Sequence, residues 1–259
     1  DEERRKVQED FSFDNIDIIV ATNAFGMGID KSNVRFVIHY NIPKNMEAYY
    51  QEAGRAGRDG EESECILLFS PQDIRIQKYF IDESHLPPDR KNYEYNKLRT
   101  MVDYCYTSKC LRAYILEYFG EKNVMENCNN CSNCKDEREE KDITIEAQKI
   151  FSCVYRMKER FGVNMIADVL KGSKNKKVLT SGLDELSTYG IMKEFSQRHI
   201  VALINKLIAD EFLLTTDEKY PVVKLRSKSY DVLRGKEKVF MKITKVKKVS
   251  KPDNALLEI

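Results

Sequence analysis

The sequence lacks long apolar runs and a secretion signal, and it contains only three histidines. No stretch approaches the ~20 apolar residues that span a bilayer, which argues against an integral membrane protein. No signal-peptide pattern opens the sequence, so we expect a cytoplasmic protein whose cysteines are reduced or bind metal. His39 ends an apolar run, where it either takes part in coupling between motifs or, as we favour, packs in the core. The other two histidines suggest no role.

The chain also has almost no net charge, +1 from 43 Lys and Arg against 42 Asp and Glu. This balance conceals an asymmetry. Residues 141–259 contain 24 basic and 15 acidic residues, whereas residues 1–140 contain 19 and 27. A basic module joined to an acidic one is typical of a protein in which one part contacts a polyanion. We therefore expect the second half to make that contact.

Four of the seven cysteines are spaced as metal ligands. Cys128, Cys131 and Cys134 follow one another at three-residue intervals, and Cys110 lies upstream at the end of a helical stretch. A tetrahedral Zn²⁺ ion takes four thiolates, provided that the backbone coils tightly between them. A closed four-thiolate shell has no open position, so we expect structural Zn²⁺ without a catalytic role. The intervening residues tolerate turn and left-handed conformations; they are Asn129, Asn130, Ser132 and Asn133.

Other interpretations of these cysteines remain open. An iron–sulfur cluster also uses C-x₂-C-x₂-C, but the x₃-C-P that continues the ferredoxin pattern is missing here. Buried free thiols are a second alternative, and a disulfide in an oxidising compartment is a third. The isolated Cys65, Cys105 and Cys153 would be unusual in a secreted protein. Structural zinc is the interpretation that we favour.

The length predicts about two domains, or three if a small one is held by metal. Residues 1–84 have an α/β pattern, in which a charged helix over 1–13 precedes apolar runs and a further helix opens near Asn45. This alternation predicts a parallel sheet with function at the strand ends. So thin a sheet indicates the back part of a larger domain. The predicted strands are residues 16–20, 34–39 and 64–69.

Residues 85–140 predict a helical hairpin leading into the four-cysteine subdomain, with 135–141 as a linker. Residues 141–236 predict a winged helix, because helices are followed by two β-like stretches. A basic turn at 171–177 lies between its helices. Residues 237–259 have little core pattern and are expected to be a flexible basic tail. The expected elements of the winged helix are helices 144–161, 165–170 and 196–210 and strands 212–216 and 220–225.

Residues 51–60 read Q-E-A-G-R-A-G-R-D-G and place two arginines about one helical turn apart. Glycines beside Arg55 and Arg58 leave room for a ligand or a second domain. A guanidinium group suits a transferring phosphoryl group, as in an arginine finger. Taken alone, such a pair is more often explained by surface ion pairs, here with Glu52 and Asp59.

Residues 21–30 read A-T-N-A-F-G-M-G-I-D and directly follow a predicted strand. A G-x-G turn is weak evidence by itself, because glycines mark any tight turn from strand to helix. Phe25 and Met27 would ordinarily be core residues. The two motifs together, at this spacing, are more specific than either one.

The runs A-T-N-A-F-G-M-G-I-D-K, V-I-H-Y-N-I-P and Y-Y-Q-E-A-G-R-A-G-R-D-G closely resemble motifs V and VI of the second RecA-like domain of superfamily 2 helicases, and specifically the RecQ family. RecQ proteins follow this domain with a helical zinc module and a winged helix, in the order predicted above. The resemblance covers residues 1 to about 240. It implies an ATP-dependent DNA helicase that moves 3′ to 5′ and serves DNA repair and recombination.

By this resemblance, Arg58 corresponds to the arginine finger that senses the γ-phosphate, and Arg55 to its neighbour at the same interface. Gln51 opens the motif and couples the ATP and DNA sites. Asp30 corresponds to the motif V acid near the ribose, with Gly28 beside it. ATP and Mg²⁺ would be held mainly by a first RecA-like domain.

The resemblance also implies ligands for zinc and contacts to DNA. Backbone amides and lysines on duplex phosphates would give affinity without sequence specificity. Tyr220, at the wing tip, would stack on a base or separate the strands, or instead pack in the wing's own core. The implied zinc ligands are Cys110, Cys128, Cys131 and Cys134. The other implied DNA contacts are Thr22 and Asn23 in the loop, and Lys171, Ser173 and Lys177 in the basic turn.

A RecQ helicase also needs a G-K-[ST] P-loop, a D-E-x-H Mg²⁺ site and an aromatic-rich DNA loop in its first RecA-like domain, and none of these precedes motif V here. We therefore expect this chain alone neither to hydrolyse ATP nor to unwind DNA. The alternative is a stand-alone zinc-stapled winged-helix regulator, which would have no use for motif VI. In either case we expect a monomer, associated with the bacterial nucleoid, that binds junctions of single-stranded and duplex DNA.

Overall fold

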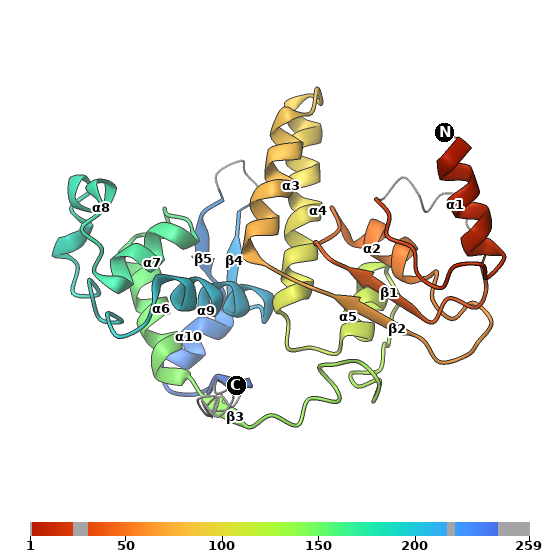
Figure 1. Ribbon diagram of the computed structural model, residues 1–259. Coiled ribbons are helices and arrows are strands. Elements are labelled where there is room, and N and C mark those ends of the chain that lie inside the picture. The colour runs from red at the N-terminus through yellow and green to blue at the C-terminus, as the bar shows by residue number, and fades with distance from the viewer. Residues whose placement is uncertain (1, 23–30, 217–220, 243–259) are drawn as a thin grey trace, which may run out of the picture. The chain divides into compact units, whose positions relative to one another are not determined.

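The computed structural model describes residues 2–22, 31–216 and 221–242, and these form two compact units (Figure 1). The first unit holds the described residues up to 107 together with 114–124, and the second holds 108–113 and the described residues from 125 onward. The first unit contains a parallel strand pair with helices, and the second contains helices with two antiparallel strand pairs. This agrees with the expected fold class. Within the described ranges, no helix is long and apolar enough to cross a membrane.

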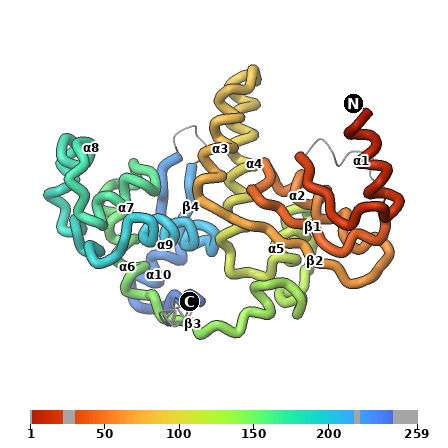
Figure 2. Tube along the Cα trace, in the orientation of Figure 1, coloured from red at the N-terminus to blue at the C-terminus, as the bar shows by residue number. Residues whose placement is uncertain are grey.

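The first unit is built around a short parallel sheet. Strands β1 and β2 pair in parallel with Val37 opposite Cys65, and they run side by side in Figure 2. Asn45 caps helix α2 by accepting a hydrogen bond from the Ala48 backbone N–H at 2.9 Å, which confirms the helix predicted near that residue. The elements up to this point are α1 (Glu2–Ser12), β1 (Phe36–His39), α2 (Met46–Ala53) and β2 (Glu64–Leu67).

The strand predicted at residues 16–20 is not formed. Residues 15–22 have no strand assignment, and the side chains of Ile18 and Val20 are 64% and 96% exposed. A parallel strand is held by hydrogen bonds to a neighbour and by apolar burial on both faces. An apolar run predicts burial, but it does not show whether a neighbouring strand is available for hydrogen bonds. Here neither condition is met.

Three helices follow the sheet: α3 (Pro71–Glu83), α4 (Pro88–Tyr106) and α5 (Leu111–Tyr118). The last two agree with the predicted hairpin. Helix α3 was not predicted, although it packs on α4. Its start carries a capping box, in which the Ser70 hydroxyl accepts from the Gln72 backbone N–H and the Asp73 carboxylate accepts from the Ser70 N–H. A serine followed three residues later by an acid is a recognisable start of a helix.

A small core joins α2 to α4 in the first unit. Met46 and Met101 are fully buried, Leu98 is 1% exposed, and the rings of Tyr49 and Tyr104 lie 5.2 Å apart. The Tyr104 hydroxyl donates to the Tyr49 hydroxyl at 3.3 Å. Helix α2 is therefore fixed just before the segment that carries the two arginines.

The second unit contains a winged helix with one continuous apolar core. Helix α7 packs on α6 and α9, and α6 also packs on β5. The two predicted β-like stretches form the antiparallel pair β4–β5, with Leu214 opposite Lys224. Fully buried core residues include Ile150, Phe151 and Ile204. The elements are α6 (Thr144–Arg156), α7 (Val163–Lys171), α8 (Lys176–Thr180), a 3₁₀ turn at Leu183–Glu185, α9 (Gln197–Ala209), β4 (Leu213–Thr215) and β5 (Val223–Leu225).

The predicted linker and the described part of the predicted tail each contain a strand, and the two strands pair with each other. Strand β3 lies at the end of the predicted linker, and β6 lies in the predicted tail. Lys141 stands opposite Met241 in their antiparallel ladder, and Val239 is only 3% exposed. Local pattern did not reveal this, because each strand has three residues and its partner is about a hundred residues away. The remaining elements are β3 (Glu140–Asp142), α10 (Ser227–Leu233) and β6 (Phe240–Lys242).

Candidate metal centre and nucleic-acid interface

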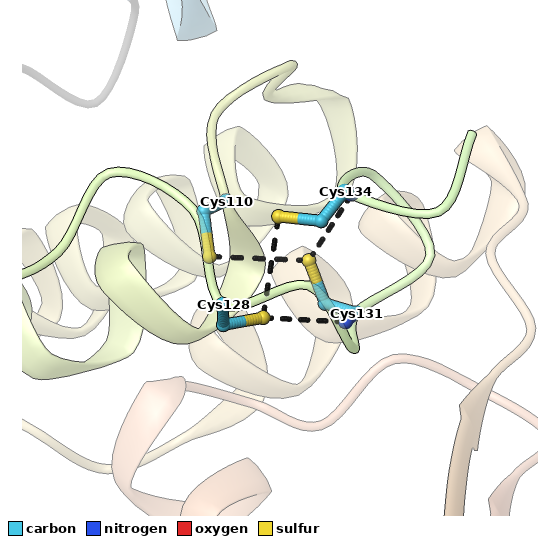
Figure 3. Close-up of side chains that lie close together, drawn as sticks. All are labelled: Cys110, Cys128, Cys131 and Cys134. Carbon is cyan, nitrogen blue, oxygen red and sulfur yellow. Dashed lines mark hydrogen bonds between the residues drawn. The ribbon is translucent and has the colours of Figure 1, made fainter. Parts of the chain in front are cut away.

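The four predicted ligands converge on one point in the second unit (Figure 3). All four sulfurs lie within 4.8 Å of one another, and the Cys128–Cys134 and Cys131–Cys110 pairs are each separated by 4.0 Å. A disulfide would need about 2.05 Å. Four sulfurs around one Zn²⁺ at about 2.3 Å lie about 3.8 Å apart. The donor set and its spacing therefore fit a tetrahedral thiolate site.

The backbone between these cysteines coils as the sequence predicted. Asn129 has a φ of 55°, in the left-handed region, and its N–H donates to the Asn127 side chain at 2.7 Å. This turn directs the Cys131 N–H to the Cys128 sulfur at 3.2 Å, and the next turn directs the Cys134 N–H to the Cys131 sulfur at 3.4 Å. Amides that point at sulfur favour the thiolate form, which binds metal.

The electrostatics of the cluster also favour a cation. Burial by itself would raise the pKa of Cys128, but N–H donors from Asn130 and Cys131, together with hydrogen bonds from the Cys110 and Cys131 thiols, lower that pKa to about 6. Burial and the neighbouring sulfurs raise the pKa of Cys134 to about 11. Several thiolates in so small a volume repel one another, and a bound divalent ion removes that penalty.

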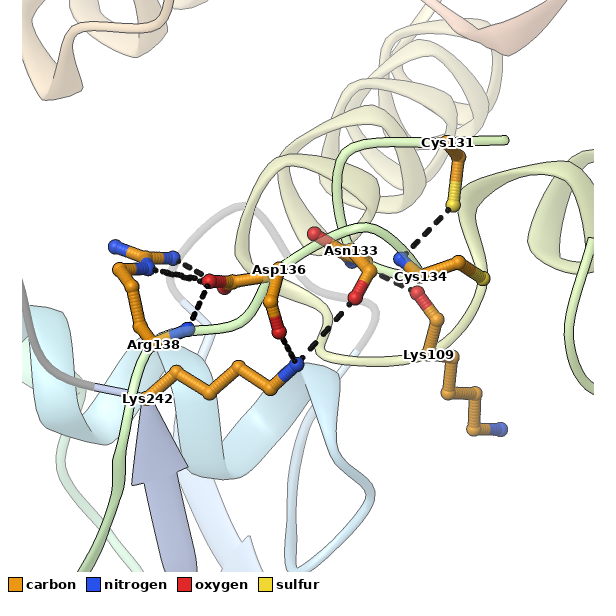
Figure 4. Close-up of polar contacts among 7 residues, drawn as sticks. All are labelled: Lys109, Cys131, Asn133, Cys134, Asp136, Arg138 and Lys242. Atoms are coloured by element: carbon orange, nitrogen blue, oxygen red, sulfur yellow. Dashed lines mark hydrogen bonds and ion pairs between the residues drawn. The ribbon is translucent and has the colours of Figure 1, made fainter. Parts of the chain in front are cut away.

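The fourth ligand is tied to the other three. Cys110 is 5% exposed, and its sulfur accepts from the Ala113 N–H at 3.5 Å. The Asn133 side-chain amide donates to the Lys109 carbonyl at 2.7 Å, and this bond joins the C-x₂-C-x₂-C segment to the residue before Cys110 (Figure 4).

The other three cysteines lie outside this group. Cys65 is exposed, and burial raises the pKa of both Cys105 and Cys153 to about 12. A thiol whose pKa is raised in this way stays protonated near neutral pH and is a poor metal ligand. Within the described residues, no other group of histidine, cysteine and acidic side chains is arranged to hold a metal.

The two arginines of residues 51–60 follow helix α2 in the first unit. Gln51 is exposed on the last turn of α2, Arg55 is half-buried, and Arg58 is exposed. The Arg55 Nε is buried and has no hydrogen-bond partner among the described residues. A buried donor that is left without a partner is energetically costly.

The turn that carries these arginines depends on Gly57. Its φ is +65°, its N–H donates to the Val34 carbonyl at 3.0 Å, and a Cβ there would lie 2.5 Å from the Ser63 hydroxyl. The two carboxylates of the ion-pair alternative, Glu52 and Asp59, each contact a residue of the neighbouring strand or loop. Asp59 pairs with Arg35, and a Glu52 carboxylate oxygen lies 2.9 Å from the His39 Nε2.

His39 is buried at the end of β1, as expected from the sequence. Its Nε2 meets Glu52, whereas its Nδ1 is buried without a partner among the described residues. Sequence reasoning did not find this contact between β1 and α2, because it joins residues thirteen positions apart across the sheet.

The basic turn of the winged helix is ordered by its own polar contacts. Helix α7 ends at Gly172, whose φ of +77° reverses the chain. The Lys171 ammonium donates to the Lys193 carbonyl, and the Ser173 hydroxyl accepts from the Asn175 N–H at 3.3 Å. Lys177 is exposed in the first turn of α8, beside two further exposed lysines, Lys174 and Lys176. Residues 176 and 177 belong to a short helix rather than to the turn that the sequence predicted.

Several other predicted residues are not described structurally. Thr22 is described, and it is exposed in a segment without regular secondary structure. Asn23, Gly28, Asp30 and Tyr220 lie outside the described residues.

The letters D-E-x-H do occur once, at residues 82–85, after the two arginines. Asp82 and Glu83 end helix α3, and the Asp82 carboxylate accepts from the Tyr95 hydroxyl at 2.6 Å. A helix end that follows motif VI is not the strand end at which a helicase holds Mg²⁺. The match is therefore one of letters only.

Comparison with known families gives three consecutive matches. The helicase conserved C-terminal domain matches residues 1–60, the RecQ zinc-binding domain matches residues 71–135, and the RQC domain matches residues 137–250. The zinc-binding match contains all four clustered cysteines, and the RQC match contains the winged helix.

Individual relatives agree with this order. The ATP-dependent DNA helicase RecQ of Bacillus subtilis is 53% identical over 93% of this chain, which corresponds to 41% of that relative. The protein of the same name from Haemophilus influenzae is 37% identical over 96% of this chain and 40% of its own length. The ATP-dependent helicase SGS1 of Saccharomyces cerevisiae is 36% identical over 94% of this chain and 18% of its own length. The chain thus spans about two fifths of the bacterial relatives that it matches.

Proposed function

This chain belongs to the RecQ family, in which it carries the helicase C-terminal, zinc-binding and RQC domains, and on that premise we propose that it serves an ATP-dependent 3′-to-5′ DNA helicase. In this proposal the first unit supplies an arginine finger, the four cysteines hold structural zinc, and the winged helix binds duplex DNA. The observation that carries the proposal is the four-sulfur cluster followed directly by a winged helix.

The metal in this proposal is Zn²⁺ held by Cys110, Cys128, Cys131 and Cys134. Four thiolates match its preference for soft ligands and tetrahedral geometry. When bound, the ion supplies a cross-link and no reaction chemistry, because the shell leaves no site for water. The left-handed turn at Asn129 orients the sulfurs of Cys128 and Cys131 toward the metal position, and Cys110 supplies the fourth ligand.

The proposed nucleotide contacts lie on the turn after α2. Arg58 would reach the γ-phosphate across a domain interface, with Arg55 beside it and Gln51 coupling to the DNA site. The buried, unpartnered Nε of Arg55 supports this, since an acceptor from another domain or a nucleotide would satisfy it. Asp30 and Gly28 are proposed to lie near the ribose. ATP and Mg²⁺ themselves would be bound mainly by a first RecA-like domain.

The proposed DNA contacts are phosphate contacts that carry no base specificity. Lys177 is exposed and free to reach a phosphate, whereas Lys171 also holds the turn through the Lys193 carbonyl. Ser173 would donate its hydroxyl to a phosphate, and the backbone amides of the same turn would donate as well. Thr22, Asn23 and Tyr220 complete the proposed DNA-contacting set, on a monomer that binds single-strand–duplex junctions.

Two measurements test this function. The purified chain should bind a forked DNA with an affinity that falls steeply with salt and varies little with base sequence, and it should show no DNA-stimulated ATP hydrolysis. Joining the first RecA-like domain of the Bacillus subtilis relative upstream should produce ATPase activity, and Arg58→Ala in that chain should lower kcat by about 10³-fold or more. Turnover by the 259-residue chain alone, or full activity of R58A, would contradict the proposal.

A further inference from the structure

Strand β6 pairs with β3, just before the first helix of the winged helix, and its last residue contacts the segment that carries Cys134. At its inner end the Ile143 N–H donates to the Val239 carbonyl, and the Val239 N–H donates to the Thr144 hydroxyl, both at 2.9 Å. Val239 is 3% exposed, so this end is anchored in the winged-helix core. All three residues of β3 are exposed, so that strand is held by its ladder and polar contacts rather than by apolar burial.

The outer end of β6 is Lys242, whose ammonium lies beside two carbonyls, one before and one after Cys134 (Figure 4). Its Nζ donates to the Asp136 carbonyl at 2.7 Å and to the Asn133 carbonyl at 3.4 Å. Asn133 immediately precedes Cys134. A lysine ammonium has three donors and a full charge, so these bonds are stronger than those of a neutral donor.

Both acceptor residues are themselves held in place. The Arg138 guanidinium contacts the Asp136 carboxylate through Nε at 2.8 Å and through Nη2 at 2.7 Å, which fixes Asp136 beside Lys242. The Asn133 side chain donates to the Lys109 carbonyl, next to Cys110. Lys242 therefore binds the residue that already links the two parts of the cysteine site.

We propose that Lys242 is a positioning residue for the four-cysteine site, through which docking of β6 and retention of the metal are coupled. Contacts around first-sphere ligands orient them and commonly change metal affinity by about 10- to 100-fold when removed. The coupling is reciprocal. If the Lys242 hydrogen bonds are more stable in the metal-bound state, they raise the affinity for the metal, and the metal stabilises them by the same free energy. The proposal rests on the zinc site proposed above, and it assigns a role to a segment that the sequence suggested was a free tail.

The first test measures zinc release from the metal-loaded full chain into an excess of a coloured chelator. Lys242→Met removes the ammonium but keeps the aliphatic stem, and we expect release about tenfold faster. Lys238→Met is the matched control on the same segment, because Lys238 is 70% exposed and pairs with Asp142 at 3.5 Å rather than with the cysteine segment. Lys242→Arg keeps a charged donor and should restore most of the slow release.

The second test uses hydrogen exchange to ask whether the metal in turn stabilises β6. Removing zinc from the wild-type chain should increase exchange in a peptide containing Phe240–Lys242. In zinc-loaded K242M, exchange should increase in a peptide containing Cys131 and Cys134, while the circular dichroism of the winged helix stays unchanged.

The outcomes separate the two proposals. One zinc per chain with equal release rates for K242M and K238M, or unchanged exchange in β6 after zinc removal, overturns the coupling and leaves the zinc site standing. A wild-type chain that binds no zinc overturns the metal site and the coupling with it. Faster release by K242M with rescue by K242R supports the coupling.

Discussion

The Lys97 ammonium lies 2.8 Å from the Glu47 carboxylate and joins helix α4 to the first turn of α2. Glu47 belongs to the helix that ends beside Arg55, and Lys97 belongs to the helix that precedes the cysteine site. Tyr118 on α5 also hydrogen-bonds to Glu47. The pair therefore links the arginine-bearing segment to the helices on either side of Cys110.

This pair predicts a pH-dependent contribution to stability. Burial alone would raise the pKa of Glu47, but the hydrogen bond and charge of Lys97, together with hydrogen bonds from the Glu47 N–H and the Tyr118 hydroxyl, lower the pKa overall. A lowered carboxyl pKa stabilises the folded state above the unfolded pKa of about 4.3, and this stabilisation is lost as the pH falls through the folded value. Lys97→Met should thus cost about 1 kcal/mol near pH 7 and less near pH 4.

Urea denaturation of the two chains at both pH values measures this difference. Lys122→Met removes an exposed lysine from the same unit and serves as the control. A K97M deficit that is equal at both pH values would show that the cost comes from lost packing instead of charge.

Removal of a cysteine ligand should abolish metal binding. Cys131→Ser replaces a thiolate that receives two N–H donors, from Leu111 and Cys134, and zinc content should fall from about one ion per chain to near zero. Thermal unfolding should shift downward in parallel, because the metal's binding energy is folding energy for this segment. Elemental analysis and calorimetry give the two readouts.

Cys65→Ser is the matched control for the cysteine experiment, since Cys65 is exposed and lies outside the cluster. Loss of zinc from C65S as well, or full zinc in C131S, would contradict the four-ligand assignment.

Lys177→Gln should weaken DNA binding without changing stability. The side chain is exposed, so its loss removes a phosphate contact and little packing. The slope of log affinity against log salt should fall by about 0.9, equally for unrelated DNA sequences. Anisotropy titrations across salt concentrations measure this slope. Lys236→Gln, an exposed lysine elsewhere in the same unit, should leave it unchanged.

Gly57→Ala should distort the turn that carries the arginines. Its Cβ would meet the Ser63 hydroxyl at 2.5 Å and the Glu61 carbonyl at 2.9 Å, in addition to the strain of a φ of +65°. We expect a cost of about 1–3 kcal/mol in chemical denaturation. Gly60→Ala separates the two effects, because its φ is +86° but nothing lies within 4 Å of the added carbon. Equal costs for the two variants would mean that the close contact is relieved.

Local sequence pattern predicted the elements whose signals are local. The Asn45 cap, the period of α4 and the 13-residue helix α9 appear where the pattern placed them, because capping and apolar periodicity depend on neighbours within a few residues. The strand at residues 16–20 was wrong, because a strand also needs a partner that periodicity does not reveal. Helix α3 was missed although Ser70 and Asp73 mark its start.

The candidate sites divide in the same way. The spacing of Cys128, Cys131 and Cys134 was sufficient to predict their convergence, because short intervals leave the backbone few ways to coil. The pairing of Arg35 with Asp59 and the burial of the Arg55 Nε could not be predicted, because both depend on the fold of the whole first unit.

By itself, the sequence predicted the clustering of the four cysteines, the winged helix and the family, since these depend on residue type and short-range spacing. Tertiary structure alone decided that Phe240–Lys242 forms a strand, that Val239 is buried, and that Lys242 binds the carbonyls beside Cys134. The physical reason is distance along the chain. A contact over 109 positions is stabilised only once the winged-helix core has brought its two ends together.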